Sequence, residues 1–330
     1  MGATVSWINT LSYSNRPGSL DRAIAAWLLA QESGALREKA DRLTEAYRHG
    51  RNSAHIDHAA YLTARMPATY AAVGRVLSQV SAIAEGFVPK SILDVGAGPG
   101  TASWAALQRW PEVASVTMIE ADARFASLAG ELAGASEIPT LAAATIIKAK
   151  LGENSAKAEL VIAAYVFAEL EERASGEAAL KLWAQAEQML VIIEPGTPRG
   201  FARIRNARAA LLDAGAHMLG PCTHSCSCPM SGKDWCHFTQ RLARSREHMH
   251  AKAASVPFED ESFSWIAVSR QKYDVPQARI VAPPVTTKIS TILKLCSAEG
   301  IYAKQIASRD KQAYKLAKKL EWGECIPANL

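Results

Sequence analysis

Six cysteines are the residues of this 330-residue chain best able to bind a metal. Thiolates bind zinc or iron–sulfur clusters, and a tight cysteine group without a recognisable secretory signal favours a metal site over disulfides. The spacing is not that of a zinc ribbon, and it leaves zinc, a four-iron cluster and unligated buried thiols open. Two of the six, Cys296 and Cys325, stand apart in sequence. The other four lie within 15 residues and are Cys222, Cys226, Cys228 and Cys236.

A second chemical signal is a glycine loop, Asp94-Val95-Gly96-Ala97-Gly98-Pro99-Gly100, between a short apolar run and a helical pattern. Glycines let the backbone approach a ligand closely, and the following helix N-terminus favours the negative end of that ligand. The dinucleotide fingerprint requires a glycine where this chain has Thr101. The alternating spacing is instead typical of the S-adenosylmethionine loop of class I methyltransferases.

The next predicted strand ends in Glu120, and a carboxylate at that position can accept hydrogen bonds from ribose hydroxyls. Asp94 is expected to lie near the methionine amino group or to hold the loop, and an adenine contact is expected within residues 144–147. The predicted S-adenosylmethionine-binding residues are therefore Asp94, Gly96, Gly98, Gly100 and Glu120.

No methyl-acceptor site is recognisable. The fourth predicted strand ends in residues 163–170 without the Asn or Asp followed by two prolines that amino-group methyltransferases usually carry. Residues 159–200 contain no cysteine for pyrimidine carbon-5 chemistry. Glu169 and Glu194 are candidate polar groups in the pocket, with helix capping or loop hydrogen bonding as the alternative role. The catalytic residues are therefore left open.

These signals lie in a segment where strands and helices alternate, which predicts an α/β fold with a parallel, doubly wound sheet. Apolar patterns predict the elements. The strands are residues 91–95, 116–120, 142–147, 160–166, 189–194 and 262–268, and the helices are 101–110, 122–132, 175–188 and 201–214.

Three regions follow from this pattern. Residues 1–88 are predicted to form an N-terminal helical module in which Pro67 begins or breaks a helix. Residues 89–270 are predicted to form a class I S-adenosylmethionine-dependent methyltransferase (Rossmann-like) domain with a cysteine-rich insertion at 217–258. Residues 271–330 are predicted to form a small basic module, a β-hairpin with a turn at 297–300 followed by a closing helix.

Charge is distributed unevenly along the chain. Residues 91–194 carry a net charge of −7 and residues 270–330 a net charge of +6, within an overall +5. Basic flanks around an acidic cofactor domain favour a polyanionic partner, with simple solvation of the surface as the alternative. Basic side chains that could grip phosphates flank the cysteines: Arg199, Arg203, Arg205, Arg208, Arg241, Arg244, Arg246, His248 and His250.

The motif order resembles the methyltransferase-like proteins of the small ribosomal subunit, which occur in mitochondria and in bacterial relatives. The resemblance covers most of the chain from about residue 40 onward. It rests on residues 61–73, 92–101, 194–198, 216–246, 258–264, 295–300 and 322–323.

That resemblance implies association with small-subunit ribosomal RNA during assembly and a [4Fe-4S] cluster beside the cofactor pocket. The family's ligand pattern places the cluster on Cys222, Cys228, Cys236 and Cys296, so that Cys226 is an extra thiol. The preferred hypothesis is an RNA-binding, S-adenosylmethionine-binding assembly or translation factor. The alternatives are an active ribosomal RNA methyltransferase, and a zinc-stabilised methyltransferase with a substrate other than RNA.

The chain has no run of 18 apolar residues and no typical signal peptide at its start, so neither a membrane span nor secretion is expected. We expect a bacterial cytoplasmic protein, or a mitochondrial matrix protein if the source is eukaryotic. Away from the ribosome, we expect a monomer.

Overall fold

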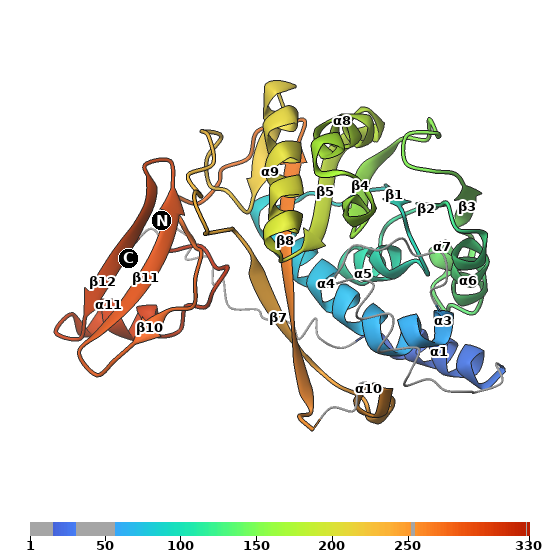
Figure 1. Cartoon of the computed structure of the whole chain (residues 1–330), viewed down its shortest axis with the longest axis horizontal. Coiled ribbons are helices and arrows are strands. Elements are labelled where there is room, and N and C mark those ends of the chain that lie inside the picture. Colours follow the sequence, from blue (N-terminus) through green and yellow to red (C-terminus); the bar gives the residue numbers. More distant parts are fainter. Residues whose placement is uncertain (1–15, 31–56, 252–254, 328) are drawn as a thin grey trace.

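Two β-sheets organise the chain, in a computed structural model that describes residues 16–30, 57–251, 255–327 and 329–330 (Figure 1). The larger sheet has the strand order β3-β2-β1-β4-β5-β8-β6, and β7 pairs with β8 beside this path. Its strands β1 to β5 are parallel, and β8 runs antiparallel to β5. The predicted α/β fold with a mostly parallel sheet is confirmed. Within the described ranges, no helix is long and apolar enough to cross a lipid bilayer.

The six strands predicted for this segment lie close to their predicted positions, whereas β6 and β7 were not predicted. The strands of the larger sheet are β1 Ser91–Val95, β2 Ser115–Glu120, β3 Thr145–Lys148, β4 Ala158–Ala164, β5 Ala186–Pro195, β6 His217–Gly220, β7 Phe238–Ala243 and β8 Phe258–Ser269. Strand β4 ends before the predicted residue 166, because Tyr165 adopts a left-handed backbone conformation with a φ of 64°. Strand β3 starts three residues later than predicted.

Helices cover both faces of this sheet because successive side chains of a strand point to opposite sides. Ile92 and Leu160 contribute to the core beneath α4, α5 and α6, whereas Leu93 and Val161 contribute to the core beneath α8 and α9. The helices are α4 Met66–Ile83, α5 Thr101–Arg109, α6 Ala123–Gly134, α7 Pro139–Ala142, α8 Ser175–Gln185 and α9 Pro198–Asp213.

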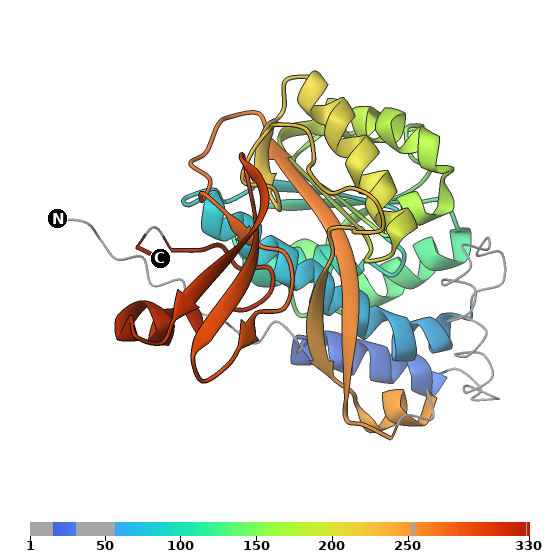
Figure 2. The same cartoon turned by 60° about the vertical axis from the view of Figure 1, so that its left-hand side comes forward.

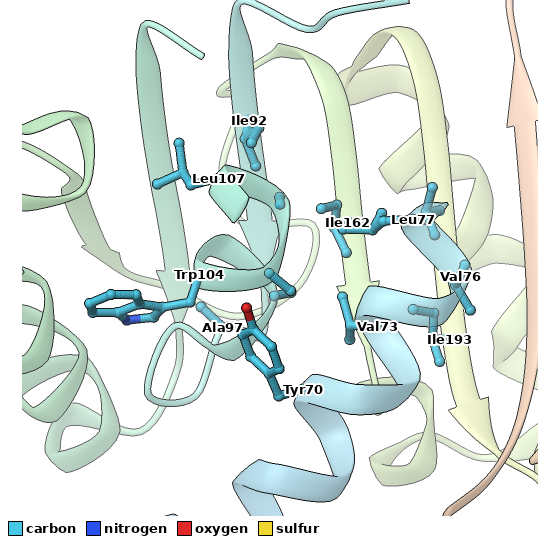
Figure 3. Close-up of a cluster of buried hydrophobic side chains, with 14 of the residues drawn as sticks. Tyr70, Val73, Val76, Leu77, Ile92, Ala97, Trp104, Leu107, Ile162 and Ile193 are labelled. Atoms are coloured by element: carbon cyan, nitrogen blue, oxygen red, sulfur yellow. The ribbon is translucent and has the colours of Figure 1, made fainter. Parts of the chain in front are cut away.

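The N-terminal helices belong to the first of these layers. Helix α1, Gly18–Ala30, contacts α6, and α3, His58–Ala60, leads through the π-helical turn η1, Tyr61–Arg65, into α4. Pro67 lies in the first turn of α4, directly after the π-helical turn. Figure 3 shows side chains of α4 packed between α5 and the central strands. The described part of residues 1–88 therefore shares its core with the sheet.

The cysteine-rich segment is also joined to the sheet. Strand β6 pairs with residues 267–269 of β8, and β7 pairs with residues 258–263 of the same strand. Residues 221–237 leave the sheet between these two pairings and return to it. The segment 217–258 thus contributes two strands to the larger sheet and carries a loop between them, together with the short helix α10, Arg246–Ala251.

The smaller sheet lies outside the helix-covered layers, on the side of the molecule where β7 and β8 lie (Figures 1 and 2). It contains β9 Arg279–Ile280, β10 Val285–Thr286, β11 Ser290–Ser297 and β12 Gly300–Ala307, followed by α11, Lys311–Ala317. Strands β11 and β12 form the predicted hairpin, and Gly300 at its turn has a φ of 114°. Leu293, Leu295 and Ile306 pack against Ala317 in a small separate core.

Candidate functional site: a cofactor pocket and a cavity lined by four thiols

The glycine loop lies between β1 and α5, and all three of its glycines have positive φ angles. These are 67° at Gly96, 54° at Gly98 and 83° at Gly100. A Cβ at Gly96 would lie 2.4 Å from a methyl carbon of Val166, so that a side chain there would push the loop away from the segment after β4. The loop therefore needs glycine for both its backbone conformation and its close packing.

Glu120 holds the loop from the end of β2. Its carboxylate accepts hydrogen bonds from the backbone N–H groups of Gly98, at 2.7 Å, and of Asp122, at 2.8 Å. Glu120 also lines the pocket that opens beside the loop. The carboxylate is thus fixed by two backbone donors at the edge of the pocket, and hydrogen bonding to ribose hydroxyls stays a prediction for it.

Asp94 has a different position. Its side chain is buried and accepts hydrogen bonds from the Ser103 backbone N–H at 2.9 Å and the Ser103 hydroxyl at 2.8 Å. Burial raises the pKa of this carboxyl to about 6. It does not line the pocket among the described residues. Of its two predicted roles, the geometry favours holding the loop, since Asp94 ties β1 to α5.

The pocket has a volume of about 690 Å³ and lies at the carboxyl ends of the parallel strands. Ligands of doubly wound sheets bind at this edge, at the point where strand order reverses. The wall beyond β3 is formed by residues 149–151 rather than by the predicted 144–147. The N-terminal segment and the segment after β4 also contribute, through Tyr61, Tyr165 and Glu169, and the sequence alone had pointed only to the last of these.

Glu194 lies outside the pocket and is fully buried at the end of β5. One carboxyl oxygen accepts a hydrogen bond from the Phe167 backbone N–H at 2.8 Å, and the other has no hydrogen-bond partner among the described residues. Burial raises the pKa of Glu194 to about 8, opposed by its hydrogen bond from Phe167 and by the nearby Arg203 guanidinium. Its role is to cap the turn after β4, which was the alternative to a role in the pocket.

This buried carboxyl predicts a pH-dependent stability. Between the ordinary pKa near 4.5 and the folded value of about 8, the folded protein keeps a proton that the unfolded chain releases. The contribution of Glu194 to the free energy of unfolding therefore falls as pH rises through that window. Relative to wild type, Glu194→Gln should be more stable at pH 8.5 than at pH 5, by roughly 3 kcal/mol.

Urea unfolding at the two pH values measures this difference. Glu187→Gln, at an exposed position on the same strand, is the matched control and should follow the wild-type pH dependence. Identical pH dependence in Glu194→Gln and wild type would contradict the assignment.

The second feature is a small cavity between the cysteine-rich loop and the smaller sheet. All four cysteines that the resemblance implies as ligands line it: Cys222, Cys228, Cys236 and Cys296. Cys226 is exposed and does not line this cavity, and neither does Cys325, which pairs with Arg279 next to Cys296. Three thiols thus come from the loop 221–237 and one from β11, more than 50 residues away.

The backbone around these thiols is held by several side chains of the surrounding fold. Arg208 donates hydrogen bonds to the carbonyl oxygens of His224 at 3.0 Å and Cys226 at 2.7 Å. The Trp235 indole donates to the Gly196 carbonyl at 2.9 Å, and the Ser264 hydroxyl donates to the Cys236 carbonyl at 2.7 Å. The loop is therefore pre-positioned by α9 and β8.

Electrostatics at this cavity couple the thiols to one another. Burial, with the neighbouring thiols adding to it, raises the pKa of Cys222 and Cys236 and raises that of Cys296 to about 12. The guanidinium groups of Arg208 and Arg279 oppose this rise. Among the described residues, no group of three or more His, Cys, Asp or Glu side chains is arranged to hold a single metal ion. In their donor chemistry, four sulfur atoms beside two buried arginines suit a thiolate-bound metal centre.

Most of the described arginines expected to grip phosphates have other partners. Arg203 and Arg208 are buried, and Arg203 donates to the Leu170 carbonyl at 2.9 Å. Arg241 pairs with Asp260 at 2.8 Å, and Arg244 pairs with Glu259 at 3.4 Å. That expectation is wrong for Arg203 and Arg208, because both are buried and donate to backbone carbonyl groups. The ion pairs of Arg241 and Arg244 tie β7 and the residue after it to β8, and their contact with phosphates stays a prediction. His248 is also buried, beside Glu259, whereas Arg199 and Arg205 are exposed.

The strand order and the glycine loop define the class of protein. A parallel sheet with an antiparallel β8 between β5 and β6, and a ligand loop after β1, is the class I S-adenosylmethionine-dependent methyltransferase fold. Solved structures of similar fold include the magnesium protoporphyrin IX methyltransferase of Synechocystis with bound S-adenosylmethionine. It is 14% identical, with a TM-score of 0.42, over 73% of this chain and 100% of that one.

Within this class, the chain belongs to the Rsm22 family, described as mitochondrial small ribosomal subunit Rsm22, whose model matches residues 55–327. Human ribosome assembly protein METTL17, mitochondrial, is 24% identical over 81% of this chain and 62% of its own length. Rsm22-cox11 tandem protein 2, mitochondrial, of Schizosaccharomyces pombe is 25% identical over 81% of this chain and 43% of its own length. The chain thus spans less than two thirds of each of these relatives.

Proposed function

We propose that this chain is an RNA-binding factor for assembly of the small ribosomal subunit, built on an S-adenosylmethionine-binding methyltransferase fold. The observation that carries the proposal is membership of the Rsm22 family over residues 55–327, together with a human relative named as a ribosome assembly protein. The uneven charge of the chain supports a polyanionic partner.

S-adenosylmethionine is the cofactor that the pocket fits. The residues proposed to hold it are Gly96, Gly98 and Gly100 through the loop backbone and Glu120 through the ribose, with Asp94 bracing the loop. When bound, the cofactor supplies an electrophilic methyl group. The chain's own part is to orient it at the strand ends, and no residue of the pocket is assigned as a base.

A [4Fe-4S] cluster is proposed at the thiol cavity, held by Cys222, Cys228, Cys236 and Cys296. The donor chemistry supports it, since thiolates are the usual ligands of such clusters. Arg208 and Arg279 would offset the negative charge of four thiolates. The proposed role is structural, because the ligands join the loop 221–237 to β11 of the smaller sheet. Zinc is the alternative occupant.

Ribosomal RNA is proposed to bind the C-terminal module. Residues 279–320 contain nine Lys or Arg residues and two acidic residues. Exposed apolar side chains lie among these charges, including Ile289, 73% exposed at the tip between β10 and β11, and Tyr302, 41% exposed on β12. Basic side chains beside exposed apolar and aromatic groups suit contact with both phosphates and bases.

A charge-neutralising variant tests this surface. Lys311, Lys315 and Lys319 are exposed along and just after α11, and their joint replacement by Gln should weaken binding to small-subunit RNA by about 10- to 100-fold near 0.1 M salt. The slope of log affinity against log salt should become shallower by up to about three, because fewer counterions are released.

Filter binding over a salt series measures both quantities. The matched control replaces Lys90, Lys148 and Lys157, which are exposed on the larger domain, by Gln. Equal losses in the two triple variants would mean that only net charge matters and would overturn the assignment of this surface.

An active ribosomal RNA methyltransferase is the second candidate, favoured by a pocket that continues past the glycine loop to Glu169 and Lys181. A methyl-transfer assay distinguishes the enzyme from the assembly factor. The protein is incubated with labelled S-adenosylmethionine and with small subunits from cells that lack it. Label in RNA that depends on Glu120 would make the chain an enzyme. Binding to those subunits without transfer of label would make it an assembly factor.

A further inference from the structure

The segments 61–73 and 258–264 are among those that carry the family resemblance, yet they contain neither the glycine loop nor the thiols. The structure brings these two segments together. Arg65, from the segment 61–73, forms a bidentate ion pair with Glu261, from the segment 258–264, at 3.0 and 2.8 Å. The Tyr165 hydroxyl donates to the same carboxylate at 2.8 Å. Three segments that are far apart in the chain therefore meet at one buried carboxylate, which is 7% exposed.

Tyr165 is held in an unusual backbone conformation at this meeting point. It is the one non-glycine residue with a positive φ in the part of the chain that the structure describes. Its backbone N–H donates to the Ile193 carbonyl at 2.7 Å. Such conformations cost energy in a bulky residue, persist only where surrounding contacts enforce them, and are concentrated at functional sites.

The unusual backbone conformation of Tyr165 lies beside the cofactor loop. Tyr165 directly follows β4, the strand beside β1, and the neighbouring Val166 lies against Gly96 of the cofactor loop. Tyr165 itself lines the pocket. Tyr165 and the glycine loop therefore follow adjacent strands, β4 and β1, at the point where the strand order reverses. A ligand bound at the strand ends lies between them.

The ring has little freedom in this place. The Arg65 guanidinium lies 4.8 Å from the ring centroid, an attractive cation–π arrangement. Burial, together with the charge of Glu261, raises the pKa of the Tyr165 hydroxyl well above its usual value, so the hydroxyl stays protonated and keeps donating. The hydroxyl end and one side of the ring are thus fixed by groups from β8 and η1.

We infer that Tyr165 is a contact residue for S-adenosylmethionine, and that Glu261 and Arg65 are positioning residues that act through it. This inference rests on the proposed cofactor. It assigns the segments 61–73 and 258–264 to one task, which is to fix the wall of the pocket opposite the glycine loop.

Calorimetric titration with S-adenosylmethionine tests the inference. Tyr165→Asn removes the ring but tolerates the left-handed backbone, and it should weaken binding about 10-fold. Glu261→Met keeps the volume but removes the acceptor, and it should weaken binding by about 5-fold. Glu261→Gln should bind nearly as well as wild type, because its amide oxygen still accepts the hydrogen bond from the Tyr165 hydroxyl. In the double variant, Glu261→Met should weaken S-adenosylmethionine binding by less than about 2-fold beyond the effect of Tyr165→Asn alone.

Asp260→Asn, next in sequence but exposed and paired with Arg241, is the control and should bind like wild type. Thermal unfolding of each variant checks that it is folded, and Tyr165→Phe, with the ring intact, should lose only about 2- to 3-fold in affinity. Multiplicative losses in the double variant would overturn the positioning role, and unchanged affinity in Tyr165→Asn would overturn the contact. If wild type itself does not bind, the proposed cofactor fails and this inference fails with it.

Discussion

Cys296→Ser should abolish bound iron and acid-labile sulfide in protein purified without oxygen, whereas Cys226→Ser should retain both. Both residues are cysteines, and they differ only in their position in the fold. Cys296 lines the cavity with three other thiols, and Cys226 is exposed outside it. A cubane cluster uses about four thiolates, so that losing one of the four removes most of the metal. Iron content should fall from about four per chain to less than one.

Loss of the cluster should also loosen the C-terminal module. In the proposed cluster Cys296 is the ligand contributed by β11, so its replacement removes one link between the smaller sheet and the loop 221–237. Metal binding to a structural site contributes directly to folding stability, and the melting temperature should fall by about 10 °C. Limited proteolysis should then cut faster within residues 271–289, which join β8 to β11.

Two outcomes would contradict this assignment. Stoichiometric zinc without sulfide in the wild-type protein would replace the cluster with a single ion. Equal iron in Cys296→Ser and Cys226→Ser would mean that the thiol on β11 is not a ligand. If iron chelation does not change the digest, the cluster does not brace the C-terminal module. The assignment of the four ligands would be unaffected by that result.

Glu120→Ala should weaken S-adenosylmethionine binding by about 100-fold, the second large effect that we expect. The substitution removes the proposed acceptor for ribose hydroxyls, and charge-assisted hydrogen bonds contribute roughly 1.5–3 kcal/mol each. It also releases the backbone N–H groups of Gly98 and Asp122, which the carboxylate now holds at 2.7 and 2.8 Å. The loop therefore loses its anchor together with its ligand contact.

Equilibrium dialysis with labelled cofactor measures this loss. Glu120→Gln keeps one acceptor oxygen and should fall between Glu120→Ala and wild type. Glu112→Ala, on an exposed position just before β2, removes the same charge without touching the pocket and should bind normally. An equal loss in Glu112→Ala would reveal a general charge effect, and full affinity in Glu120→Ala would exclude this carboxylate from the site.

Much of the fold was predictable because short-range patterns dictate it. The largely apolar runs at 92–95 and 189–193, each with an acidic residue within or just after it, are typical of strands buried on both faces, and both became central strands. The glycine loop was recognisable since its backbone conformations exclude other residues. Predicted boundaries failed where a tertiary contact decides, as at Tyr165, which ends β4 early although its side chain suits a strand.

The site could be predicted only in part. Residues of the glycine loop and Glu120 follow one another along the chain, so their types and spacing carry the information. Arg203 and Arg208 were expected at the surface, because nothing local distinguishes a buried arginine on α9 from an exposed one. Their burial depends on carbonyl groups supplied by residues 168–170 and by the cysteine-rich loop.

The amino-acid pattern alone predicted the α/β class, the cofactor loop and a cluster of cysteines. Each of these features depends on residues that are close together in the sequence. Only the tertiary structure brought Cys296 to the other three thiols, and only it joined Arg65, Tyr165 and Glu261 at the pocket wall. Those contacts span tens to almost 200 residues, and strand order, rather than local propensity, determines which distant segments meet.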